Sequence, residues 1–167
     1  GIPVLSPLAS DLAGDVVSRV RGIVNGTTNY ILTAMADEGR AYDDVLADAQ
    51  ARLRRLTPKA AHAAMADGWI LVDTRSSDAR RADGVIPGAI HVPLSVLEWR
   101  VDPASGRQDP RIAGRERRLI LLCTEGYASS LAAVRLHELG FPETTDVIGG
   151  FAAWRAAGLP IDRPGTE

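Results

Sequence analysis

The chain has 167 residues, of which 46% are hydrophobic and 24% are charged, so its composition favours a folded domain over a disordered segment. Lysine and arginine total 19 against 21 acidic residues, and this net charge of −2 gives no electrostatic case for nucleic acid or an anionic membrane as a partner. No apolar run approaches the roughly 20 residues that a membrane span needs. A single Cys excludes an internal disulfide and a multi-cysteine metal site, and it fits a reducing cytoplasm.

The first 56 residues predict a small strand-helix-helix appendage. Valine nearly alternates with polar residues over 16–24, which is typical of a half-exposed strand. Helical stretches are expected from Thr27 or Thr28 to Ala36 and again over 42–53. These elements bury little core alone, so we expect them to dock on another surface. The basic cluster near the end of the stretch is typical of a solvated linker and consists of Arg52, Arg54 and Arg55.

Residues 57–167 predict a unit in which strands and helices alternate. Apolar runs predict strands at 69–72, 89–92, 119–122 and 146–148. Start and stop signals predict helices over 58–67, 76–83, 127–139 and 151–157, and Ser95 to Glu98 has the spacing of a capping box that starts one more. The alternation predicts an α/β fold with a mostly parallel sheet flanked by helices on both faces.

The single cysteine, Cys123, lies directly after the most apolar strand and a few residues before a helix. Open α/β folds place ligands at the carboxyl ends of their strands, and the N-terminus of a helix favours negative charge. A thiolate at this position is stabilised and therefore nucleophilic. The alternative is a small buried Cys that only closes the strand.

Four separated motifs between Thr57 and Arg163 resemble the rhodanese domain. In chain order they are 71–75, 84–93, 119–129 and 149–154, the last followed by Gly158-Leu159-Pro160. The resemblance implies a sulfurtransferase that holds a sulfane sulfur as a persulfide on Cys123. The donor would be thiosulfate or a small-molecule or protein persulfide, and the acceptor would be a thiol or cyanide. The chemistry implies no cofactor and no metal.

The loop after the cysteine would bind the substrate, and it departs from the family pattern. The family often has Cys-Arg-x-Gly-x-Arg, whereas this loop consists of Thr124, Glu125, Gly126, Tyr127, Ala128 and Ser129. Both Arg positions are lost, so an oxyanion lacks its bidentate clamp, and Glu125 adds negative charge. We therefore expect thiosulfate to be a poor donor and a persulfide to be a better one.

Asp73 and Arg75 end the first strand of this unit. Charge-assisted hydrogen bonds from such a pair can tie neighbouring loops together. We expect the two residues to support the site structurally and to take no part in the chemistry.

Residues 1–50 resemble a different family, homoserine dehydrogenase. The motifs lie at 1–3, 6–8, 12–15, 21–32 and 46–50. The resemblance stops before that family's catalytic residues, and the nucleotide-binding domain is missing, so no dehydrogenase activity is expected. We therefore divide the chain into an inactive dehydrogenase-like fragment with a linker, 1–56, and a rhodanese-like domain, 57–167. An unpaired strand in the fragment would favour a homodimer through residues 15–35.

Two other functions fit parts of the pattern. A non-catalytic rhodanese-like binding or regulatory module would explain the altered loop but not the presence of Cys123. A phosphatase of related architecture would need Cys-x5-Arg, with the Arg holding the phosphate, and this chain has Ser129 at that position.

Overall fold

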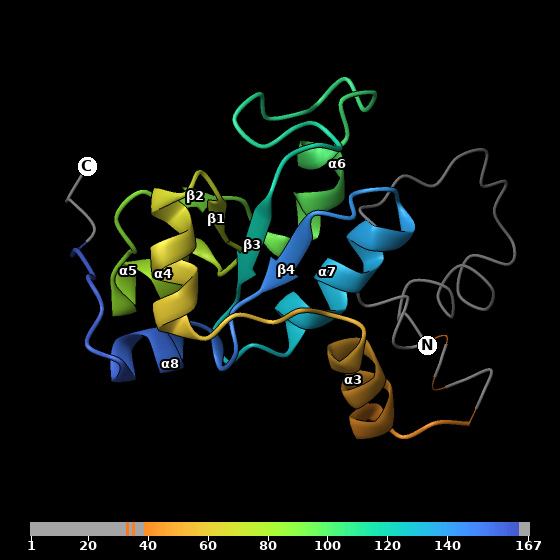
Figure 1. Cartoon of the computed structure of the whole chain (residues 1–167), viewed down its shortest axis with the longest axis horizontal. Helices are drawn as coiled ribbons and strands as arrows, with labels where there is room; N and C mark the ends of the chain where they lie inside the picture. The colour runs from red at the N-terminus through yellow and green to blue at the C-terminus, as the bar shows by residue number, and fades with distance from the viewer. Residues whose placement is uncertain (1–32, 34, 36–38, 164–167) are drawn as a thin grey trace, which may run out of the picture.

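A parallel β-sheet forms the centre of the molecule (Figure 1). The computed structural model describes residues 33, 35 and 39–163. Within this part of the chain, four strands pair in the order β2-β1-β3-β4, and every pairing is parallel. The strands are β1 (Ile70–Asp73), β2 (Ile90–His91), β3 (Leu119–Leu122) and β4 (Thr144–Asp146). The predicted α/β fold with a parallel sheet is confirmed.

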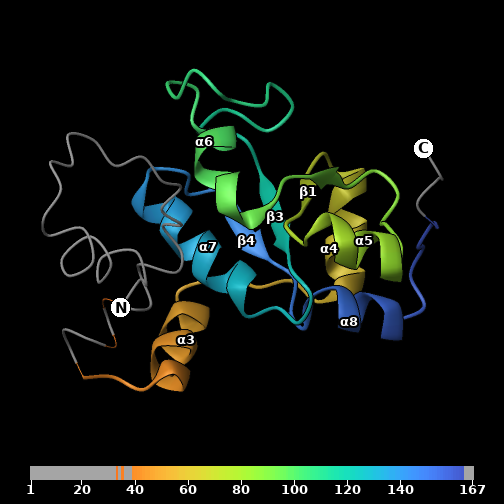
Figure 2. The same cartoon turned by 180° about the vertical axis from the view of Figure 1, so that it is seen from behind.

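Helices cover both faces of the sheet (Figures 1 and 2). One face carries α4 and α8, and the other carries α6 and α7. The helices are α3 (Tyr42–Ala51), α4 (Pro58–Ala66), α5 (Ser77–Asp83), α6 (Leu97–Val101), α7 (Ala128–Glu138) and α8 (Gly150–Ala156), with a 3-10 turn η1 (Leu94–Val96) before α6. Hydroxyl caps begin two of them, because Thr57 accepts from the Ala60 N–H and Ser76 accepts from the Ala79 N–H.

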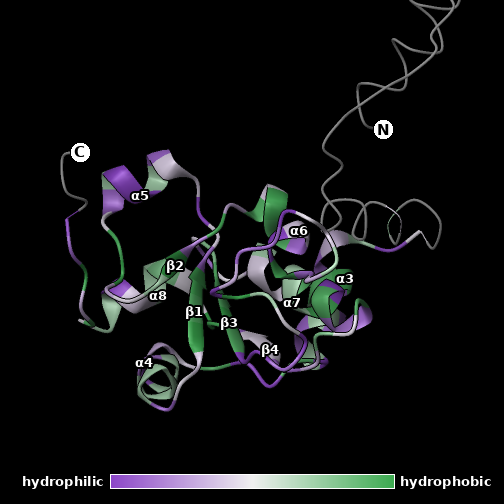
Figure 3. Ribbon diagram, turned by 90° about the horizontal axis from the view of Figure 1, so that it is seen from above, coloured by the Kyte–Doolittle hydropathy of each residue, from purple (hydrophilic) through white to green (hydrophobic). Residues whose placement is uncertain are grey.

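The alternation of side chains along β3 builds two hydrophobic cores, one on each face. In Figure 3 the ribbon of β3 has the hydrophobic colour. Leu119 and Leu121 pack into the core beneath α7, whereas Ile120 and Leu122 pack with Phe151 and other residues of the opposite face. All four residues of β3 are fully buried. A strand with apolar residues on both faces is stable only between two helical layers, which explains the continuous apolar run in the sequence.

Two local predictions about the second unit are wrong. The strand expected at 146–148 is β4, and it lies two residues earlier, because the β-branched Thr144 and Thr145 pair with β3. Ser95 does not cap a helix, because the 3-10 turn that follows Pro93 already includes it. Helix α6 then begins at Leu97 without a side-chain cap.

Helix α3 packs on the outer side of α7, at the carboxyl-terminal edge of the sheet (Figures 1 and 2). Val45, Leu46 and Ala49 of α3 form a small buried cluster with Leu131 and Val134 of α7. The expectation that the N-terminal stretch docks on another surface is therefore confirmed for α3. The strand expected over 16–24 and the dimer surface over 15–35 lie outside the described residues, except for Thr33 and Met35, which are helical.

Candidate active site

Three neighbouring strands of the sheet, β1, β3 and β4, bring polar side chains to the same edge. Asp73 ends β1, Cys123 directly follows β3, and Asp146 ends β4. Asp73 is in register with Leu122, and Asp146 is in register with Leu121. Because these strands are parallel, their carboxyl ends meet at the same edge, which is where ligands bind in open α/β folds.

The sulfur of Cys123 accepts hydrogen bonds from two backbone amides of the loop that follows it. The Gly126 nitrogen lies 3.1 Å from Sγ, and the Ser129 nitrogen lies 3.4 Å from it. Ser129 is the second residue of α7, so its N–H is one of the donors that a helix leaves free in its first turn. The thiol is half-buried rather than enclosed in the core. This arrangement stabilises negative charge on an accessible sulfur.

The loop after Cys123 packs so closely on the start of α8 that each of the two segments has a glycine at the contact. Gly126 has φ +78°, and Gly150, at the start of α8, has φ +56°. A Cβ on Gly150 would lie 2.4 Å from the Cys123 carbonyl oxygen and 2.7 Å from the Gly126 nitrogen. The backbone of α8 also holds the loop directly, because the Phe151 N–H donates to the Cys123 carbonyl at 2.8 Å.

We expect Gly150→Ala to disrupt the cysteine loop. The methyl group would force backbone atoms apart at a residue with positive φ, at a cost of about 1–3 kcal/mol. Urea denaturation measures the stability, and the rate at which iodoacetamide alkylates Cys123 measures the loop. Gly158→Ala is the matched control, because Gly158 has φ +67° and nothing within 4 Å of the added Cβ. Equal effects of the two substitutions would show that the close contact is unimportant.

Ser129 of α7 connects the cysteine with Asp146, and the neighbouring Ser130 adds a second hydroxyl to the same carboxylate. Ser129 Oγ lies 3.3 Å from Cys123 Sγ and donates to Asp146 Oδ2 at 3.2 Å. Ser130 Oγ lies 2.8 Å from the same carboxylate oxygen. Both serines and Asp146 are buried, so the carboxylate is out of contact with solvent.

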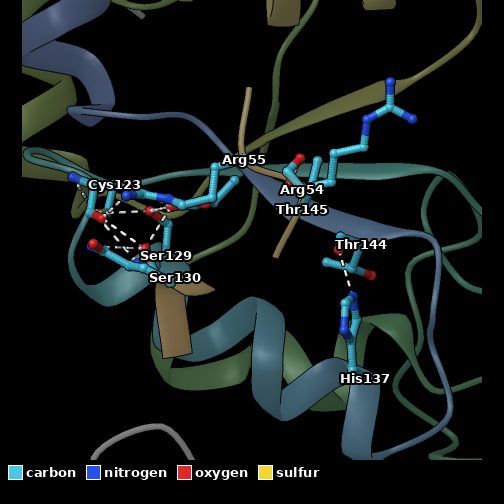
Figure 4. Close-up of polar contacts among 11 residues, drawn as sticks. Arg54, Arg55, Cys123, Ser129, Ser130, His137, Thr144 and Thr145 are labelled. Atoms are coloured by element: carbon cyan, nitrogen blue, oxygen red, sulfur yellow. Dashed lines mark hydrogen bonds and ion pairs between the residues drawn. The ribbon is translucent and has the colours of Figure 1, made fainter. Parts of the chain in front are cut away.

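Arg55 completes this network from outside the sheet (Figure 4). Its Nε and Nη2 donate to the two carboxylate oxygens of Asp146 at 2.8 and 3.0 Å, and Nη2 also donates to the Gly126 carbonyl at 2.9 Å. A bidentate pair of this kind compensates the charge of a buried carboxylate. In Figure 4 the Arg55 side chain extends toward Cys123, whereas that of Arg54 points away from it.

Sequence reasoning missed both members of this ion pair. The sequence predicts Arg55 in a solvated linker, but its side chain is only 15% exposed. Leu56 forms a parallel bridge with Val147, so the residues before α4 run extended along β4 and direct Arg55 toward Asp146. Asp146 was expected at the start of a strand and is at the end. The Thr-Thr pair before it is the signal that would have placed it correctly.

The remaining loop residues form the mouth of the site. Thr124 and Glu125 are exposed, Ala128 is half-buried, and the Tyr127 side chain is 50% exposed. The exposed Tyr127 side chain therefore belongs to the rim and does not pack into the core. Burial, and then the charges of Asp43, Cys123 and Tyr127, raise the pKa of Tyr42 in α3.

Asp73 and Arg75 form a buried ion pair next to the loop. The Nη2 of Arg75 donates to Asp73 Oδ2 at 2.7 Å and to the Gly84 carbonyl at 2.9 Å, and both side chains are fully buried. The guanidinium also lies 3.5 Å from the centre of the Phe151 ring in α8. The pair thus links β1, the end of α5 and α8. Within the described part of the chain, neither residue forms a hydrogen bond with the Cys123 sulfur.

In the same part of the chain, no three His, Cys, Asp or Glu side chains gather in a way that could hold a metal ion. Nor does any helix of residues 33, 35 and 39–163 have the length and apolar character that crossing a membrane requires.

Comparison with known proteins identifies the family of the second unit. The model of the rhodanese-like domain family matches residues 57–157, which is more than half of the chain. The chain therefore belongs to the rhodanese-like domain family.

Solved structures agree with this fold. A protein of unknown function from Rhodopseudomonas palustris, described as a possible tyrosine phosphatase, is 31% identical with a TM-score of 0.68, over 74% of this chain and 95% of that one. The polysulfide-sulfur transferase of Wolinella succinogenes is 21% identical with a TM-score of 0.59, over 81% of this chain and 96% of that one. A human single-domain sulfurtransferase is 25% identical with a TM-score of 0.53, over 61% and 95%.

The N-terminal segment matches a second family. The homoserine dehydrogenase model matches residues 3–53. The homoserine dehydrogenase of Mycobacterium leprae (strain TN) is 64% identical over 50 residues, which are 30% of this chain and 11% of that enzyme. The chain thus spans about a tenth of these curated relatives, and Arg55 and Leu56 lie between the two family matches.

Proposed function

We propose that this protein is a sulfurtransferase that carries a sulfane sulfur on Cys123. The observation that carries the proposal is the half-buried thiol that accepts two backbone N–H bonds at the N-terminus of α7. Membership of the rhodanese-like family and the similarity to sulfurtransferase structures support the same chemistry.

The reaction proceeds in two displacements at sulfur. The Cys123 thiolate attacks the outer sulfur of a donor persulfide, a new S–S bond forms, the donor's S–S bond breaks, and the donor leaves as a thiolate. An acceptor thiolate then attacks the outer sulfur of the Cys123 persulfide, and the Cys123 thiolate leaves. The N–H groups of Gly126 and Ser129 stabilise the charge on the Cys123 sulfur before the first step and after the second. No external oxidant or reductant is needed.

The mouth of the site favours a persulfide over thiosulfate. Thr124 and Ala128 stand where the family often has Arg, and the exposed Glu125 adds a negative charge beside the sulfur. Arg55, the cation that does reach the loop, already binds Asp146 and the Gly126 carbonyl. A dianion therefore meets no unpaired guanidinium in the described loop.

We expect the kcat/KM with glutathione persulfide to exceed that with thiosulfate by at least ~10-fold, because thiosulfate lacks a charge-assisted clamp. Steady-state assays with one acceptor thiol and each donor in turn measure the ratio. Glu125→Gln is the informative variant, and it should raise the efficiency with thiosulfate more than that with the persulfide. A higher efficiency with thiosulfate in the unmodified protein would refute this assignment of the donor.

A phosphatase is a second candidate, because the similar protein from R. palustris is described as a possible tyrosine phosphatase. Phosphate ester hydrolysis at a Cys requires a cation that holds the three non-bridging oxygens. Ser129 occupies the position of the Arg in Cys-x5-Arg and is bonded to Asp146, so a negative group stands behind the loop. This site disfavours a phosphate dianion, and sulfur transfer remains the better proposal.

A non-catalytic binding module is the remaining alternative, and it would leave the polarised thiol without a role.

For the N-terminal segment we propose no dehydrogenase activity, because the matched 50 residues are 11% of that enzyme. Its described helix α3 instead packs on α7 and reaches the polar network through Gln50, whose Nε2 lies 3.5 Å from Ser130 Oγ.

A further inference from the structure

We propose that Arg55 is a positioning residue for Cys123 and that it acts through Asp146 and Ser129. This inference rests on the proposed function of the same site. It assigns to the junction between the two family matches a part of the machinery that the rhodanese-like segment alone would lack.

The hydroxyl of Ser129 is the link to the sulfur. It has one proton and two acceptors, which are Asp146 Oδ2 at 3.2 Å and Cys123 Sγ at 3.3 Å. When the sulfur is a thiolate, the hydroxyl can turn to it and add a third donor to the two amides. It can do so only if Asp146 remains satisfied without it.

Arg55 keeps Asp146 satisfied. Arg55 Nη2 lies 3.0 Å from the same Oδ2 that Ser129 would leave. Ser130 Oγ lies 2.8 Å from this oxygen and 2.9 Å from the Gly126 carbonyl oxygen, so its single proton is shared between two acceptors. Without Arg55, a fully buried carboxylate would retain the Ser129 proton and would place an uncompensated negative charge one hydroxyl away from the thiolate. Both effects oppose the formation of the thiolate.

Arg55 also fixes the loop itself. It donates to the carbonyl of Gly126, and the N–H of Gly126 is the nearer amide donor to the sulfur. The two loop positions where the family often has Arg are Thr124 and Ala128 in this chain, so here the cation reaches the loop from outside it. Arg55, which precedes α4, therefore supplies a positive charge that the loop residues themselves do not provide.

The test compares Arg55→Met with Arg54→Met in the full-length chain. Arg54 is adjacent and exposed, and its side chain points away from the site (Figure 4), so it is the matched control. The rate of alkylation of Cys123 by iodoacetamide at neutral pH reports the thiolate, and transfer from glutathione persulfide reports the reaction. We expect Arg55→Met to lower both rates about tenfold and Arg54→Met to change them less than about twofold.

Two further variants separate positioning from a purely structural role. Arg55→Met with Asp146→Asn removes the unpaired charge and should restore the alkylation rate to within about threefold of the unmodified protein. Arg55→Lys keeps the charge but cannot bridge both partners as the planar fork does, and it should lower the rate about threefold. If Arg55→Met does not fold, the alkylation rate of Arg55→Lys tests the role of Arg55.

Folded Arg55→Met with the same alkylation rate as Arg54→Met would overturn the inference, as would unchanged rates in Arg55→Lys. The absence of rescue in the double variant would overturn the role of Asp146. Alkylation needs no sulfur donor, so the alkylation rates test the role of Arg55 even if the unmodified protein forms no persulfide. Failure of the unmodified protein to form a persulfide would refute the proposed function and leave the role of Arg55 intact.

Discussion

Replacing Cys123 with Ser is expected to abolish sulfur transfer and leave the fold unchanged. A serine hydroxyl is not ionised at neutral pH and cannot form the S–S bond that holds the transferred sulfur, so the rate should fall by ~10³-fold or more. Ser is nearly isosteric with Cys, and the thiol is half-buried at the end of β3, so the cost in unfolding free energy should stay below ~1 kcal/mol. Steady-state transfer from glutathione persulfide and urea denaturation measure the two quantities.

The single Cys makes this experiment clean, because Cys123→Ser has no other thiol that could carry sulfur. The same variant serves as the blank for alkylation and for the detection of persulfides. Substantial turnover in the folded Cys123→Ser variant would refute covalent transfer through this residue.

Asp73→Ala is expected to cause the largest loss of stability. Asp73 and Arg75 are fully buried, and removal of the carboxylate leaves the Arg75 guanidinium without its compensating charge beneath Phe151. Breaking a buried pair by removing one partner costs about 3–5 kcal/mol. The free energy of unfolding in urea should fall by that amount. The alkylation of Cys123 should change little below the unfolding transition, because neither residue is hydrogen-bonded to the sulfur in the described structure.

Asp78→Ala is the control for this prediction. Asp78 also pairs with an arginine, Arg81, but both side chains are exposed, and such pairs contribute at most about 1 kcal/mol. If the two substitutions destabilised the protein equally, burial of the Asp73–Arg75 pair would not be the cause.

The sheet was predictable because its strands are marked by composition. The run Leu119–Leu122 is apolar on both faces, which indicates a strand between two helical layers and so places Cys123 at the carboxyl edge of the sheet. The hydroxyl caps at Thr57 and Ser76 likewise follow from local chemistry. Local signals of this kind need no knowledge of distant contacts.

The polar network behind Cys123 was not predictable by the same means. Arg55 and Asp146 are 91 residues apart, and their pairing depends on the parallel bridge between Leu56 and Val147. The sequence predicts β4 two residues too late in the chain. Asp146 is therefore predicted at the start of the strand, whereas it lies at the end that bears the site. A basic cluster in a linker gives no indication that one of its members turns inward.

The packing of α3 was predictable only in part. Its small size implied docking, but the partner surface on α7 and the hydrogen bond from Gln50 to Ser130 depend on tertiary contacts. The helix of the dehydrogenase-like segment thus packs on α7, the helix that carries Ser129 and Ser130 of the site, a combination that neither motif alone indicates.

The central claim is that Cys123 carries a transferable sulfur, and mass spectrometry tests it most directly. The full-length protein is incubated with glutathione persulfide, freed of small molecules, and measured intact and as peptides before and after an acceptor thiol is added. We predict a gain of about 32 Da on the peptide that contains Cys123, lost on addition of the thiol and absent from Cys123→Ser. An unmodified peptide, or a gain of mass that the thiol does not reverse, would contradict the account.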